Sequence, residues 1–261
     1  MTALGGGLAG CSKNNLSDIT GSISSAVSQD RLPTSEPELR AYSEKMGQRY
    51  DSNRNDKRVA MNYARALRQL GQHTQAAAVM QELAARYPRD MEVLGAYGKT
   101  LAEAGRLQQA AAVLQNAHTP EHPNWSILSA QGSVADQLGD HRQAQNYYMT
   151  ALRIRPNEPS VLSNLGLSYA LSRNLPEAEQ ALRLAVAQPG ADMRVRQNFA
   201  LVLALEGKFT EAEEMSARDL SPMEATSNVA AIRRMIAQSN TWRDIKRYDE
   251  KAQAKTSAKR G

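Results

Sequence analysis

Small and apolar residues recur along the chain at a fixed interval. When the chain is written from Lys57 in rows of 34 that begin at Lys57, Met91, Trp125, Pro159 and Met193, three positions align. The twentieth position of every row is alanine: Ala76, Ala110, Ala144, Ala178 and Ala212. The eighth position is always alanine or glycine: Ala64, Gly98, Gly132, Gly166 and Ala200. Larger apolar residues occupy each of positions 7, 11 and 24 in four of the five rows, which predicts two amphipathic helices per row that cross closely at the small residues.

The fifteenth position predicts where the first helix of each row ends. It is glycine in four rows (Gly71, Gly105, Gly139 and Gly207), and glycine accepts the left-handed backbone of a helix C-terminus at low cost. The fourth row has Arg173 there instead. Pro88 and Pro156, at position 32, are expected to stop the second helix before the next row begins.

These positions resemble the tetratricopeptide repeat, whose length of about 34 residues equals that of one row. The resemblance covers residues 57–222 without a gap in register and implies an all-α fold. We expect a right-handed α-solenoid of about five helix pairs with helical caps at both ends, because terminal repeats need a cover for their apolar faces.

The segments that flank the array are expected to play different parts. Residues 36–56 contain an amphipathic helix with Leu39, Tyr42, Met46 and Tyr50 on one face, and are predicted to cap the N-terminal end. Residues 223–238 are predicted to form the C-terminal cap, with Val229, Ile232 and Ile236 against the fifth repeat. Residues 1–11 form a signal-like segment, residues 12–35 a flexible polar tether, and residues 239–261 a basic tail.

The net positive charge of the chain is concentrated in its C-terminal segment. The net charge is +5, which alone would suggest a nucleic-acid partner. Residues 233–261 carry nine bases and three acids, so residues 1–232 carry a net −1. Because a nucleic-acid surface would place positive charge on the folded body, we expect no nucleic-acid partner.

Cys11 is the single cysteine of the chain, and its context suggests lipid attachment. It follows Leu8-Ala9-Gly10, which resembles the lipobox of bacterial lipoproteins, and it precedes a polar stretch like the tether of an anchored domain. Ser12 stands where an Asp would resemble an inner-membrane retention signal, and its presence there favours the outer membrane. The expected location is the periplasmic face of the outer membrane through a lipid on Cys11, or the cytoplasm if the match is accidental.

No catalytic, cofactor or metal site is expected, nor a small-molecule substrate. His73 and His141 share position 17, the solvent-facing start of the second helix. His118 and His122 have metal-pair spacing, but Pro120 between them makes a continuous helix improbable, which favours ordinary turn residues. No glycine-rich phosphate loop and no activated nucleophile is evident. We therefore expect a non-enzymatic protein.

The first helices of the repeats are expected to line a concave groove that binds a protein segment. The groove is predicted to grade from basic, in repeats one and two, to apolar, in repeats four and five. Its candidate residues are Arg58, Arg65, Arg68, Lys99, Asn164, Leu167, Leu171, Asn198, Leu201 and Leu205. Two other interpretations stay open: the basic residues form a solvated face, or the apolar strip is filled by the protein's own C-terminal helix or Trp242.

The layout of lipobox, tether, repeat array and basic tail resembles the tetratricopeptide lipoprotein of the tight-adherence (Tad, or Flp) pilus machinery. The segment Asn240-Thr241-Trp242-Arg243-Asp244 adds to that resemblance. It implies a pilotin-like scaffold whose partner is the secretin or another pilus-assembly component. The alternatives are another periplasmic tetratricopeptide lipoprotein, such as a type IV pilus pilotin or a peptidoglycan-associated scaffold, and a cytosolic adaptor.

Overall fold

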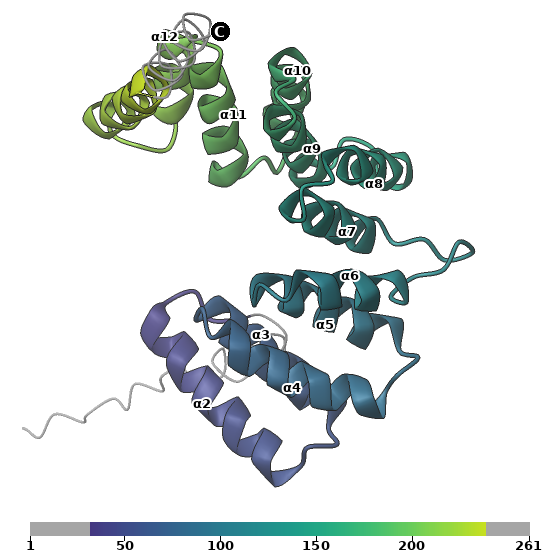
Figure 1. The fold of residues 1–261 in the computed structure, drawn as a ribbon. Helices are drawn as coiled ribbons and strands as arrows, with labels where there is room; N and C mark the ends of the chain where they lie inside the picture. The colour runs from purple at the N-terminus through teal and green to yellow at the C-terminus, as the bar shows by residue number, and fades with distance from the viewer. Residues whose placement is uncertain (1–31, 239–261) are drawn as a thin grey trace, which may run out of the picture. The chain divides into compact units, whose positions relative to one another are not determined.

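A computed structural model of the 261-residue chain describes residues 32–238. Within that range every regular element is a helix and none is a strand. The named helices are α2 (Glu36–Ser52), α3 (Lys57–Gln69), α4 (His73–Arg86), α5 (Met91–Glu103), α6 (Leu107–Gln115), α7 (Trp125–Gln137), α8 (His141–Ile154), α9 (Pro159–Leu171), α10 (Leu175–Val186), α11 (Met193–Leu205) and α12 (Phe209–Ser216). A further helix covers residues 222–238 (Figure 1).

The helices confirm the period read from the sequence. The first helix of each pair begins at Lys57, Met91, Trp125, Pro159 and Met193, which are the row starts chosen from the sequence. The second helices begin at His73, Leu107, His141, Leu175 and Phe209, which are separated by the same interval. The expected all-α array of helix pairs packed in sequence order is therefore confirmed.

The first helices begin where the sequence supplies a cap. Asp56, Asp90, Asn124 and Asp192 precede α3, α5, α7 and α11, and each side chain accepts a hydrogen bond from a backbone N–H of the first turn. Asp90, for example, accepts from Glu92 N at 3.0 Å and Val93 N at 3.2 Å. These bonds satisfy donors that a helix leaves unpaired at its start.

Each first helix is followed by one residue in the left-handed backbone conformation. Gly71, Gly105, Gly139 and Gly207 have φ between 73° and 88°, and Arg173 takes the same conformation with φ 64°. After α9, Arg173 N donates to Ala170 O at 3.0 Å and Asn174 N donates to Tyr169 O at 2.8 Å. This bonding pattern closes a helix C-terminus, so repeat four ends like the others without the glycine.

The chain divides into two compact units, Met1–Val79 and Met80–Gly261, with the boundary inside α4. In the first unit α2 packs on α3 and buries Leu39, Met46 and Tyr50. The Tyr50 and Tyr63 rings lie 5.8 Å apart, and the Tyr63 hydroxyl accepts from Gln75 Nε2 at 3.0 Å. The face of residues 36–50 expected to be apolar is thus the buried face, except that Tyr42 is only half-buried.

In the second unit the helices of a pair cross at the small residues. A Cβ on Gly98 would lie 2.5 Å from Leu114 Cγ, and one on Gly166 would lie 2.6 Å from Leu182 Cγ. Ala110, Ala144, Ala178 and Ala212 are fully buried on the second helices. Absence of side-chain bulk at repeat positions 8 and 20 is therefore what lets the two helices approach.

Residues 222–238 cover the last pair. Val229 is buried in one core cluster with Phe199 and Met215, and Ile232 packs at its margin. The Arg233 guanidinium lies over the Phe209 ring, 5.1 Å from its centroid. This helix therefore packs against repeat five, where the sequence placed a cap.

Candidate functional site

The basic candidates of the first unit lie on α3. This helix carries four basic residues and no acidic one. Arg58 and Arg65 are exposed and Arg68 is half-buried. Arg65 Nη1 donates to the buried Asn62 Oδ1 at 3.4 Å. The exposed side of α3 therefore carries arginine side chains, and the helix itself contributes no acidic side chain.

In the second unit, polar candidates on the first helices join consecutive repeats. Asn164 Nδ2 donates to Ser129 Oγ at 3.3 Å, and Asn198 Nδ2 donates to Ser163 Oγ at 3.0 Å. Both bonds span 35 residues, so they repeat with the array. The sequence placed these asparagines among the groove candidates, and in the structure their amide groups brace one first helix against the next.

Lys99 makes a related contact one repeat earlier. Its Nζ donates to Ser126 Oγ at 2.8 Å, which links α5 to α7. Lys99 is half-buried, so its stem is packed while its charge remains near the surface. Its charge is thus held in place by the neighbouring repeat.

The four apolar candidates form two registered pairs on α9 and α11. Leu171 is 58% exposed and Leu205, one repeat later, is 39% exposed. Leu167 and Leu201 lie one turn earlier on the same helices and are half-buried. Because α9 and α11 pack against each other, these leucines make one apolar strip, which we call the leucine strip (Leu167, Leu171, Leu201 and Leu205).

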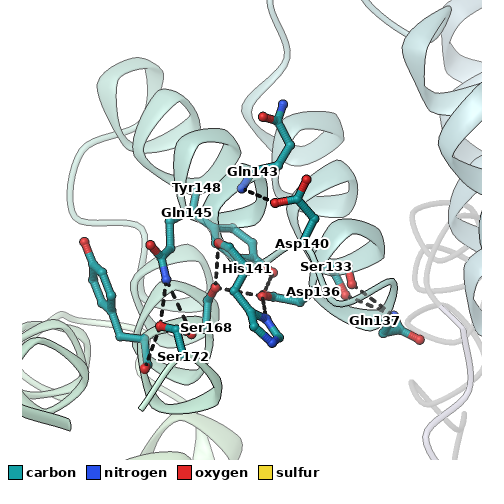
Figure 2. Close-up of polar contacts among 11 residues, drawn as sticks. Ser133, Asp136, Gln137, Asp140, His141, Gln143, Gln145, Tyr148, Ser168 and Ser172 are labelled. Carbon is teal, nitrogen blue, oxygen red and sulfur yellow. Dashed lines mark hydrogen bonds and ion pairs between the residues drawn. The ribbon is translucent and has the colours of Figure 1, made fainter. Parts of the chain in front are cut away.

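A polar cluster that the sequence did not indicate centres on Asp136 (Figure 2). Its carboxylate accepts from Ser168 Oγ at 2.7 Å and from the Tyr148 hydroxyl at 3.1 Å, and lies 2.9 Å from His141 Nδ1. The Asp136 side chain is 10% exposed and Ser168 is fully buried. The cluster ties α7, α8 and α9 together at the junction of repeats three and four.

The residue types of the Asp136 cluster match those of a hydrolase triad, but their arrangement does not. A nucleophilic serine must give its proton to the histidine. Here Ser168 Oγ bonds to Asp136 Oδ1, and its second partner is the backbone oxygen of His141 at 3.5 Å. Burial, and next the charge of Asp136, raise the pKa of Tyr148 well above its usual range. The cluster holds three helices together and has no activated nucleophile.

His141 therefore differs from the expectation of an ordinary solvent-facing residue. Its side chain is 29% exposed, and its Nδ1 contacts the carboxylate of Asp136. His118 Nε2 lies 3.2 Å from Gln131 Oε1, so this histidine packs on the next helix after its turn. Within residues 32–238, no group of three or more metal-ligating side chains comes together.

Two ion-pair groups stabilise the last repeats. Arg196 binds Asp219 through two bonds, Nε to Oδ2 at 2.7 Å and Nη2 to Oδ1 at 2.5 Å. The hydrogen bonds from Arg196 hold the pKa of Asp219 below its usual value. Lys208 Nζ lies 2.7 Å from Glu179 Oε2, which joins the start of α12 to α10 and lowers the pKa of Glu179. Asp219 of repeat five is thus a partner of α11.

Several sequence predictions lie outside the described residues. These are the lipid site at Cys11, the signal-like segment, most of the tether and the basic tail with Trp242. Between residues 32 and 238, no helix combines the length and apolar character needed to span a membrane.

Comparison with protein families defines the class of the molecule. Residues 62–123 and 129–192 each match the tetratricopeptide repeat model. These two segments of the chain are therefore built of tetratricopeptide repeats. No sequence relative was found among curated proteins.

Solved structures with the same fold include PilW, PilF and the APC/C hetero-tetramer Cut9–Hcn1. PilW, a widely conserved type IV pilus biogenesis factor, is 16% identical with a TM-score of 0.63, covering 83% of this chain and 99% of PilW. PilF of Pseudomonas aeruginosa is 21% identical with a TM-score of 0.52, covering 69% and 82%. The APC/C hetero-tetramer Cut9–Hcn1 is 16% identical with a TM-score of 0.58 over 74% of this chain, which spans 40% of that chain. At these identities the likeness concerns the fold.

Proposed function

We propose that this protein is a non-enzymatic scaffold that holds a segment of a partner protein on its first helices, within an outer-membrane pilus-assembly machinery. The observation that carries the proposal is the leucine strip. Monomeric proteins seldom leave contiguous apolar side chains in solvent, and exposed apolar patches mark binding sites. Leu171 and Leu205 stand 58% and 39% exposed on adjacent first helices.

The chemistry of the two units suggests the kind of segment. The leucine strip suits the apolar side of an amphipathic segment. The basic, exposed side of α3 suits an acidic stretch of a partner, because opposite charges attract the two surfaces before they touch. Each surface is a candidate by itself, the leucine strip for an apolar segment and α3 for an acidic one.

The assignment to pilus assembly rests on two further points. Leu8-Ala9-Gly10-Cys11 suggests a lipid anchor, and the layout resembles the lipoprotein of the tight-adherence pilus. The fold is shared with PilW and PilF, both of which are pilus proteins. In this proposal the lipid keeps the scaffold at the outer membrane, where it raises the local concentration of the secretin or another assembly component.

The leucine strip can be tested with a matched pair of exposed leucines. Leu171→Asp should lower capture of the secretin at least about tenfold, because it places a charge in the centre of the strip. Leu184→Asp is the control, since Leu184 is 50% exposed in the same repeat but lies on the second helix, α10. Both variants should keep the helical circular dichroism of the wild type. Equal capture by the two variants would remove the leucine strip from the binding site.

The basic candidates need a separate test. Arg65→Glu combined with Lys99→Glu should weaken capture and reduce its dependence on salt, because attraction to an acidic segment is lost. Arg142→Glu, at an exposed position of α8, is the control. Unchanged capture by the double variant would mean that these residues form a solvated face.

The anchor is tested at Cys11. Cys11→Ser should abolish labelling with a radioactive fatty acid and release the protein from membranes without loss of helical signal. A wild-type chain that takes up no label would favour the cytosolic adaptor. A labelled chain that binds no secretin would favour another periplasmic lipoprotein scaffold.

A further inference from the structure

The last helix of the described chain, residues 222–238, leaves the leucine strip open. Its Val229 packs in the core cluster of repeat five and does not reach over the strip. With this helix in place, Leu171 remains 58% exposed and Leu205 remains 39% exposed. The sequence left two occupants from this chain open, the C-terminal helix and Trp242. The structure leaves the second of these, which belongs to the segment that follows residue 238.

The last helix ends close to the leucine strip. The Arg233 guanidinium lies 5.1 Å from the centroid of the Phe209 ring. Phe209 begins α12, and only the turn at Gly207, with φ 83°, separates it from Leu205. The helix continues from Arg233 to residue 238, which adds about 7.5 Å at a rise of 1.5 Å per residue. The chain therefore leaves the last helix at the same end of repeat five that carries Leu205.

The segment that begins there has the composition of an apolar ligand. Its large apolar residues are Trp242, Ile245 and Tyr248, and no other large apolar residue occurs in 239–261. Their spacing of three would place them within about 120° of a helix surface, at about 100° per residue. Four residues lead from the last helix to Trp242, and they span about 13 Å when extended. That length is enough for the indole to reach Leu205.

We propose that residues 239–250 of this chain occupy the leucine strip and that the partner protein must displace them, an inference that rests on the proposed function of the strip. Attachment to the same chain is what selects this occupant. A segment joined to its site by a short linker meets that site at an effective concentration of about 1 mM. If its affinity as a free peptide were only about 0.1 mM, it would still cover the strip about nine-tenths of the time.

This arrangement regulates the leucine strip without a further component. The covered strip is shielded from solvent and from weak, unspecific apolar contacts, which exposed leucines would otherwise attract. A partner binds only the fraction of molecules whose strip is open, so its apparent affinity is about tenfold weaker than for a strip without a competitor. Only a segment that binds more tightly than residues 239–250 gains access.

The fluorescence of Trp242 tests the contact without a partner protein. The chain has two tryptophans, so Trp125→Phe leaves Trp242 as the reporter, and Cys11→Ser removes the lipid site. Leu205→Asp should raise the acrylamide-accessible fraction of Trp242 from about one tenth toward one and shift its emission to the red. Leu184→Asp, at a 50% exposed leucine of α10, is the control and should change neither.

Two results of this measurement would overturn the proposal. The first is a Trp242 that is equally accessible in the parent chain and in Leu205→Asp, when both keep the helical circular dichroism. The second is an accessibility that falls as the protein is concentrated from about 1 µM to about 100 µM, because a contact within one chain does not depend on concentration. That second result would assign the strip to another copy of the chain.

Competition with the partner is measured separately. Trp242→Ala in the otherwise native chain should raise the apparent affinity for the secretin about tenfold, whereas Lys255→Ala, later in the same segment, should not. An affinity equal to that of the native chain would overturn the competition. If the secretin binds neither chain, the proposed function fails, and the accessibility of Trp242 still decides whether residues 239–250 cover the strip.

Discussion

Gly132 is the position where the packing of a repeat can be tested most sharply. A Cβ added there would lie 2.5 Å from Tyr148 Cε1 and 2.8 Å from both Cδ1 and Cζ of the same ring. Ordinary carbon contacts are about 3.5–4.0 Å. Tyr148 is 2% exposed, and its hydroxyl is bonded to Asp136, so the ring has nowhere to move without losing that bond.

The expected cost of Gly132→Ala is the difference between one gain and two losses of stability. Alanine improves helix propensity by about 1 kcal/mol. Overpacking a filled core costs about 1–3 kcal/mol, and a strained or lost hydrogen bond to a carboxylate costs about 1.5–3 kcal/mol more. The net loss should be about 3 kcal/mol, which lowers the thermal midpoint by about 6–12 °C in a chain of this size.

Gly95→Ala is the matched control. Its Cβ would also lie 2.5 Å from a neighbour, but that atom is the terminal methyl Cδ1 of Ile127, and the next atom is 3.6 Å away. A methyl at the end of a side chain can rotate aside at low cost. Gly95→Ala should therefore cost far less than Gly132→Ala, because the gain in helix propensity of about 1 kcal/mol offsets the cost of the rotation.

Urea unfolding followed by circular dichroism at 222 nm measures both variants. A Gly132→Ala chain as stable as Gly95→Ala would refute the reasoning. A third variant identifies the ring as the cause: repeat five has Ala200 and Ser216 at the corresponding positions. In a Tyr148→Ser background, Gly132→Ala should no longer destabilise, since the same pair of residues is accommodated in repeat five.

Three further predictions concern polar and backbone features. Asp136→Ala should lower the free energy of unfolding by about 2–4 kcal/mol, because the fully buried Ser168 hydroxyl and the Tyr148 hydroxyl lose their acceptor. The control Ser133→Ala, also on α7, should cost less than about 0.5 kcal/mol, and equal costs would contradict a central role for Asp136. Arg173→Gly should raise stability by about 1 kcal/mol by relieving a left-handed φ of 64°, whereas Arg173→Ala should give no gain; a gain with alanine would assign the effect to the side chain. Asp219→Asn should destabilise the protein at neutral pH but not in acid. Arg196 lowers the pKa of Asp219 below 3.8, so the stabilisation by the charged carboxylate is present above that value and is lost as pH falls through the folded-state pKa. A stability difference between the two chains that persists in acid would show that the charge of Asp219 is not the cause.

The repeats were predictable from sequence because their determinants are local and recur. A glycine at position 15, an aspartate or asparagine before the first helix, and small residues at positions 8 and 20 each act within one helix pair. Even repeat four, with Arg173 in the glycine position, keeps its helix starts in register. The neighbouring repeats and caps impose that register through packing.

The candidate site was predictable only in part. Leu171 and Leu205 are exposed on first helices, as expected for groove residues, and Arg58 and Arg65 are exposed on α3. Which polar residues bond to one another could not be predicted. Position 12 holds Asp136 in one repeat and alanine in three others, so nothing in the sequence marked it as the centre of a cluster.

By itself the sequence determined the period, the helix starts and the small residues at each crossing, because these depend on backbone geometry that recurs in every repeat. Only the tertiary structure decided which polar groups serve the fold. Asn164 and Asn198 donate to serines 35 residues away, and Asp136 accepts from Ser168, 32 residues away. Such bonds depend on the distance between side chains on different repeats, which packing sets and no local pattern encodes.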